Sequence, residues 1–165
     1  MLQSEHYFAW NAGVADELGE RALAVARASG DEAVLVEVLL AYVVAHSGPG
    51  TSADRLAAVE ELRSHALSGE VAAFTEFTYA RTLYERGRVE EADAAAARCA
   101  AAIVRLRHTG VDVPLAWWFL SRARESEDPD LIRSALTRLD ELPVGGAGTA
   151  AGIGAVYRRR TREPA

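Results

Sequence analysis

The spacing of the apolar residues limits the fold of this chain more than any other feature. Along most of the sequence these residues recur every three or four positions, which matches the 3.6-residue turn of an α-helix. A sustained period of two, the mark of a β-strand, is not found. Breaks rich in glycine, proline or serine interrupt the pattern near residues 29–30, 47–50, 68–69, 87 and 108–114. The sequence therefore predicts an all-α fold of about seven antiparallel helices.

The second predicted helix is apolar on most of its sides. Asp31 can cap its start, and between Ala33 and Ala45 the only charged residue is Glu37. Because helices at a protein surface usually keep a polar face, we expect this one in the centre of the fold.

Stop and start signals predict where the later helices begin and end. The fifth helix carries a narrow seam of small residues, which favours close packing. The expected boundaries are Thr51 or Ser52 to Ser68-Gly69 for the third helix, closure at Gly87 for the fourth, Val89 to Leu106 for the fifth, Pro114 onward for the sixth, and Asp128-Pro129 to Pro143 for the seventh.

The length of 165 residues suits a single domain with one core. We expect a helical-repeat domain over residues 1–143 and a glycine-rich, arginine-containing flexible tail over 144–165. The net charge of -6 argues against direct nucleic-acid binding. Two uncharged stretches, at 38–53 and 142–157, are broken by glycine or proline, so no membrane span is predicted. The single cysteine and the lack of a secretion signal predict a cytoplasmic protein.

Residue types exclude several kinds of chemistry. All 18 basic residues are arginine, so a lysine-containing P-loop and Schiff-base catalysis are excluded, and the bias towards arginine and alanine indicates a GC-rich, actinobacterial genome. The four histidines are far apart, and no metal site or cofactor is predicted. Cys99 lies on the small-residue seam and is expected to be a buried, inert thiol. Glu61 and His65, four residues apart, are expected to pair on the surface.

Three positions suggest a repeat of about 39 residues. Helix hairpins that bury only part of their apolar surface stack against their neighbours, which would give a right-handed, tetratricopeptide-like α-solenoid. The anchors Gly30, Ala41 and Gly48 return as Gly69, Ala80 and Gly87.

The second copy, YARTLYERGRVEEADAAAA, resembles a tetratricopeptide repeat in its spacing of Ala80, Leu83, Gly87 and Ala92. The copy departs from the motif where Glu76 stands at the usual tryptophan and Val104 at the usual proline. At a larger scale, the segments GPGTSADRLAAVEELRSHA, LYERGRVEEADA and RHTGVDVPLAWWFLSRA resemble the helical-repeat region of actinobacterial LuxR-type and AfsR/SARP-type transcriptional regulators, over roughly residues 16–125. This resemblance implies a sensor or autoinhibitory module, although the ATPase and DNA-binding domains of those regulators have no counterpart here.

The tetratricopeptide register turns one face of the first helix of each pair towards a concave groove. Consecutive tryptophans project about 100° apart on a helix, so one of the pair at 117–118 should meet a groove or a partner. The candidate ligand-binding residues are Tyr42, His46, Phe74, Phe77, Arg81, Tyr84, Trp117 and Trp118.

These features favour a noncatalytic module that binds a protein, a peptide or a small effector. Arg81 is expected to make a bidentate contact with a carboxylate while aromatic side chains bury apolar ligand surface. One alternative is a small all-helical enzyme of specialised metabolism, which would act on a hydrophobic substrate with acid–base help from Tyr42, His46 or Tyr84. Another alternative is a homodimer in which the exposed ends of the helix stack pack against each other.

Overall fold

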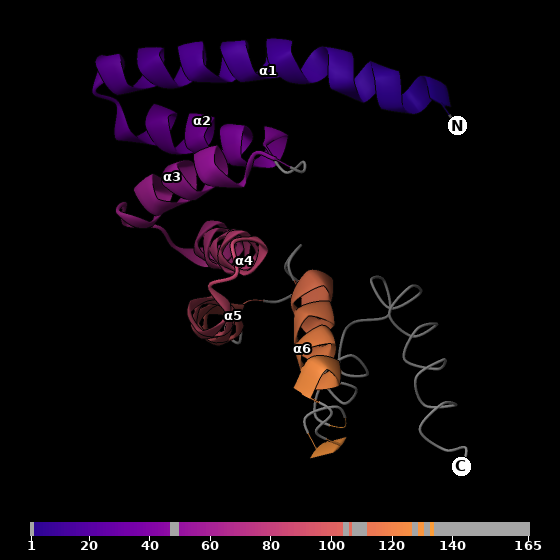
Figure 1. Ribbon diagram of the computed structural model, residues 1–165. Coiled ribbons are helices and arrows are strands. Elements are labelled where there is room, and N and C mark those ends of the chain that lie inside the picture. Colours follow the sequence, from indigo (N-terminus) through magenta and orange to yellow (C-terminus); the bar gives the residue numbers. More distant parts are fainter. Residues whose placement is uncertain are drawn as a thin grey trace. The chain divides into compact units, whose positions relative to one another are not determined.

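The computed structural model describes residues 2–46, 50–103, 106, 112–126, 129–130 and 133, without the side chains of residues 2–15, 112–113, 116–117, 124 and 126. These described residues form six α-helices and no strand, which confirms the all-α class. The helices are α1 (Leu2–Ser29), α2 (Glu32–Ala45), α3 (Ser52–Arg63), α4 (Gly69–Glu85), α5 (Val89–Ile103) and α6 (Asp112–Ser126) (Figure 1).

Some predicted segments lie outside the described residues. Residues 129, 130 and 133 are helical, whereas most of the predicted seventh helix and the whole predicted tail at 144–165 are not described. The chain divides into two compact units. The first comprises residues 1–67 and 78–92, and the second comprises residues 68–77 and 93–165.

Two helix ends follow the predicted stop and start signals. Asp31 caps α2, because its Oδ1 accepts hydrogen bonds from the backbone N–H groups of Ala33 and Val34 at 3.0 and 3.2 Å. After α4, Gly87 has a φ of 75°, and the N–H of Arg88 donates to the carbonyl of Leu83 at 2.9 Å. A left-handed residue that closes a helix in this way is usually glycine, because a side chain would be strained there.

Other boundaries differ from the predictions. The third helix ends at Arg63 rather than at residues 68–69, and Gly69 instead begins α4. The C-cap of α3 is Ser64, whose hydroxyl donates to the Glu61 carbonyl at 2.6 Å, so the helix stops without a glycine. The fifth helix ends at Ile103, three residues early, and the sixth begins at Asp112, two residues before the proline.

In the first unit, α2 lies between α1 and α3, as its apolar composition predicts (Figure 1). Leu39 and Val43 of α2 are completely buried, as are Val59 and Leu62 of α3. At about 25 cal/mol per Å² of buried apolar surface, side chains of this kind supply most of the stability of such a hairpin. These side chains belong to the core of the unit, to which Leu23 and Ala26 of α1 also contribute.

The second unit contains the small-residue seam of α5. Ala95, Ala96 and Cys99 are completely buried, and the Cys99 thiol donates to the Ala73 carbonyl at 3.2 Å. The thiol thus lies in the core, as predicted. Ion pairs at the surface of this unit join Arg98 to Glu76 and Arg122 to Asp93.

The 39-residue register agrees with the helix boundaries. Moved by 39 residues, α2 would span 71–84 and α3 would span 91–102, which fall within α4 and α5. Of the anchors, Gly30 and Gly69 both have a positive φ, of 68° and 60°. The alanine anchors differ, however, because Ala80 is completely buried whereas Ala41 is exposed. The repeat therefore fits the lengths of the helices better than it fits their contacts.

Candidate functional site

A buried arginine connects three helices of the first unit. Arg55 of α3 is completely buried. Its Nε donates to the Thr82 hydroxyl at 2.8 Å, its Nη1 to the His46 carbonyl at 2.7 Å, and its Nη2 to the Glu85 carboxylate. The Thr82 hydroxyl in turn donates to the Thr78 carbonyl at 2.8 Å. Each nitrogen of the guanidinium therefore has a partner, as a buried charge requires.

Arg81, one turn before Glu85 on α4, has fewer partners. Its side chain is 37% exposed, and its Nε lies 3.4 Å from Glu85 Oε1 without hydrogen-bond geometry. Among the described residues, its Nε and Nη2 are buried and have no hydrogen-bond partner. Burial lowers the pKa of Arg81, and the nearby charge of Arg55 lowers it further, while Glu85 opposes the shift. Two guanidinium groups thus share one carboxylate, which leaves an excess positive charge.

Tyr42 and His46 come together in the core between α1 and α2. Their rings stack with centroids 3.7 Å apart, and both side chains are buried. The Tyr42 hydroxyl donates to Glu20 at 2.6 Å, and burial together with this carboxylate raises the pKa of Tyr42 above its ordinary value of 10. The phenol therefore keeps its proton at neutral pH.

Both ring nitrogens of His46 face oxygen atoms. Nδ1 lies 2.8 Å from the Tyr42 carbonyl, and Nε2 lies 2.9 Å from Asp16 Oδ1. A carbonyl oxygen can only accept, so Nδ1 donates to it. The ring is held on both sides and anchors the end of α2 to α1.

The remaining predicted site residues lie on two helices. Phe74, Phe77, Arg81 and Tyr84 follow a spacing of three and four residues along α4, and each is partly buried. The two phenylalanines belong to the second unit, whereas Arg81 and Tyr84 belong to the first. Trp118 of α6 is partly buried, and the side chain of Trp117 lies outside the described residues.

Sequence reasoning missed Arg55, although its position carries a signal. Arg55, Val59 and Leu62 are spaced by four and three residues, so they lie on one stripe of α3, and all three are buried. A charged residue on an apolar stripe is a candidate for a buried ion pair. The polar partners come from other helices, so the sequence alone could not identify them.

The predicted pair between Glu61 and His65 is wrong. Since α3 ends at Arg63, the helical spacing of four residues does not extend to His65. Glu61 instead accepts two hydrogen bonds from Arg27 of α1, at 2.6 and 3.1 Å. His65 Nδ1 lies 2.9 Å from Glu32 Oε1 of α2.

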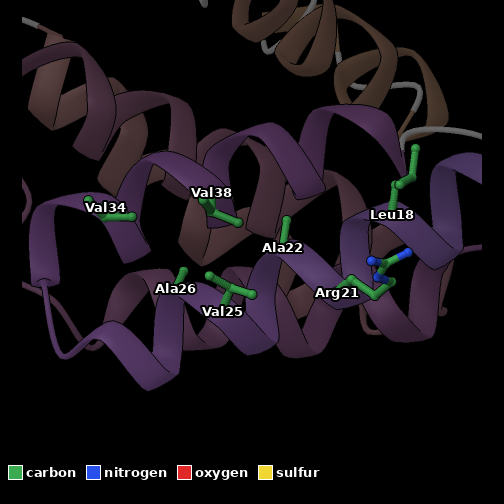
Figure 2. Close-up of a pocket in the computed structure, with 7 residues that line it drawn as sticks. All are labelled: Leu18, Arg21, Ala22, Val25, Ala26, Val34 and Val38. Carbon is green, nitrogen blue, oxygen red and sulfur yellow. The ribbon is translucent and has the colours of Figure 1, made fainter.

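An apolar groove of about 400 Å³ lies between α1 and α2 (Figure 2). Five residues of α1 and two of α2 line it, and the only charged one is Arg21. The lining residues are Leu18, Arg21, Ala22, Val25, Ala26, Val34 and Val38.

Among the described residues, no three histidine, cysteine or carboxylate side chains lie together in a way that could hold a metal ion. Over the same residues, no helix is long and apolar enough to cross a membrane. In comparisons with known proteins, no family model matches the chain, and neither a curated protein nor a solved structure matches it.

Proposed function

We propose that this chain is a noncatalytic helical-repeat module that recognises an acidic group of a protein, a peptide or a small effector at Arg81. The single observation that carries the proposal is the pair of buried nitrogens on Arg81 that have no hydrogen-bond partner among the described residues. In this proposal the helix pairs form a right-handed, tetratricopeptide-like solenoid, related to the sensor region of LuxR-type and AfsR/SARP-type regulators and acting in the cytoplasm.

The chemistry of Arg81 supports an anionic ligand. A buried donor without a partner costs roughly 1–3 kcal/mol. The Arg81 side chain is partly exposed, so a change of its rotamer could present Nε and Nη2 to a carboxylate, which would remove that cost. Glu85 cannot fully compensate both guanidinium groups, because it also accepts from Arg55. A bound carboxylate would bring the local charge to neutrality.

The enzyme alternative has weaker support from the same contacts. Its proposed acid–base groups included Tyr42 and His46, and both side chains are buried and engaged with Glu20 and Asp16. A general base must reach a proton of the substrate, which these contacts disfavour. Recognition therefore accounts for the arrangement better than catalysis.

Binding of a small, defined probe tests the proposal. The probe is the N-acetyl dipeptide Leu-Phe with a free terminal carboxylate, compared with the same dipeptide as its terminal amide, by NMR titration. We expect the acid to bind more tightly than the amide and Arg81→Ala to weaken binding of the acid by about ten-fold or more, since charge-assisted hydrogen bonds contribute roughly 1.5–3 kcal/mol.

The matched control is Arg86→Ala, which removes an exposed arginine just beyond the end of α4. This variant should bind the acid as the unchanged protein does. Equal binding of acid and amide would refute the carboxylate contact. A loss of helicity in Arg81→Ala, followed by circular dichroism, would instead show that Arg81 is structural.

A further inference from the structure

The groove between α1 and α2 exposes large apolar side chains. Val25 is 71% exposed, Leu18 57% and Val34 42%. Figure 2 shows Val34 and Val38 on one side of the groove and the α1 residues on the other. Clustered exposed apolar side chains around a hollow often mark an interaction surface.

The surface carries both large and small apolar side chains. Leu18 and Val25 protrude from α1, whereas Ala22 and Ala26 between and beside them are small. An interface between identical copies requires protrusions and hollows on the same patch. This face has both.

The charges on this face are complementary as well. Arg21 of α1 lines the groove. Glu37 of α2 does not line it, but it lies three residues after Val34 and directly before Val38, so helical spacing places it at the edge of the groove. Both side chains are exposed, and neither has an ion-pair partner within the described part of the chain. A two-fold axis parallel to the hairpin would lay α1 of one copy across α2 of the other. Arg21 of each copy would then face the partner's Glu37, so the interface would contain two such ion pairs.

We propose that two copies of this chain associate through the groove between α1 and α2, with Leu18, Val25 and Val34 buried at the interface and Arg21 paired with the partner's Glu37. The interface is separate from Arg81, so it holds or fails independently of the proposed ligand. The dimer would remove the exposed apolar side chains of this face from water.

Analytical ultracentrifugation of the full chain tests the dimer. The unchanged protein should sediment as a concentration-dependent dimer, and Val25→Glu should weaken association by about ten-fold or more, because it places a charge in the apolar centre. Val25 is largely exposed within one chain, so circular dichroism should show unchanged helicity. A protein that is monomeric up to roughly 100 μM, about ten times the Kd of a weak dimer, overturns the proposal and assigns the groove to another occupant.

A charge exchange tests the orientation. Arg21→Glu and Glu37→Arg should each weaken the dimer, and the double variant should restore it, because opposite charges then face each other again. The control is Glu60→Arg, the same charge change at an exposed position of α3, which should leave association unchanged. Failure of the double variant to recover refutes the proposed two-fold arrangement.

Discussion

At the scale of single residues, Arg55 shows how one buried charge can organise several helices. Its three nitrogens contact the end of α2 and two positions of α4, although the residue itself belongs to α3. Buried ion pairs are weak contributors when compared with an apolar core, but removal of one partner is costly. Removing the Arg55 side chain therefore tests how much these contacts contribute to the stability of the three helices.

Replacing Arg55 should destabilise the protein strongly. Arg55→Ala removes the donor to the Thr82 hydroxyl and the charged partner of one Glu85 oxygen, and it leaves the His46 carbonyl with the Thr51 hydroxyl as its remaining side-chain donor. The substitution also opens a cavity, so we expect the free energy of unfolding to fall by about 3 kcal/mol. Urea denaturation followed by circular dichroism measures the change. Arg86→Ala, at an exposed arginine, should stay within about 0.5 kcal/mol, and an equally small effect for Arg55→Ala would contradict the role described for it.

At the scale of helices, the contact between α1 and α2 depends on a glycine inside a helix. A Cβ added at Gly19 would lie 2.9 Å from Tyr42 Cδ2 and 3.1 Å from Tyr42 Cε2. Glycine usually weakens a helix interior by about 1 kcal/mol relative to alanine. Here its lack of a side chain lets the stacked rings of Tyr42 and His46 approach α1.

Gly19→Ala should therefore lower stability in the unchanged protein, in spite of the better helix propensity of alanine. Overpacking costs roughly 1–3 kcal/mol, which exceeds the gain in propensity. When Tyr42→Ala has removed the ring, the same Gly19→Ala change should become stabilising by about 1 kcal/mol. Urea denaturation of all four proteins measures this cycle, and an effect of the same sign in both backgrounds would show that the ring is not the obstacle.

The helices themselves could largely be predicted from the sequence, because their signals are local. The three-to-four spacing, the Asp31 cap and the left-handed Gly87 each depend on neighbouring residues. The partners of charged groups depend on the fold, as Arg27 and Glu61 show, since 34 positions separate them. Local rules of helical spacing instead predicted a pair between Glu61 and His65, which the end of α3 at Arg63 prevents.

The candidate site was predicted less completely than the helices. Arg81 was identified from its register on a helix face, but its unsatisfied nitrogens depend on Arg55, whose burial was not foreseen. Tyr42 and His46 were assigned to the same groove, whereas the structure stacks them against α1 beneath Gly19. Aromatic residues at helical spacing do not reveal by themselves which neighbouring helix they meet.

At the scale of the whole molecule, one ion pair ties the first helix to the third and should respond to acid. The Arg27 guanidinium, through its two hydrogen bonds, lowers the pKa of Glu61 below its ordinary value of 4.5. A carboxyl group with a lowered pKa stabilises the fold above its unfolded-state pKa. This contribution is lost as the pH falls through the lower, folded-state value.

The difference in melting temperature between the unchanged protein and Glu61→Gln should therefore be largest above about pH 5 and should disappear in stronger acid. Because both side chains are partly exposed, the difference should be small and should shrink in 0.5 M salt, at which the Debye length falls to roughly 4–5 Å. Thermal melts from pH 3 to pH 7 measure it. A difference that stays constant over this range would show that the ion pair does not account for the effect of the substitution.

The arrangement around Arg55 also limits how this architecture can be exchanged between proteins. Arg55 lies on one helix, the carbonyl that it binds ends the helix before it, and Thr82 and Glu85 lie on the helix after it. A graft that transplants only one hairpin into a foreign scaffold would separate this arginine from some of its acceptors. The smallest segment that could be transferred with all of these contacts therefore spans α2 to α4.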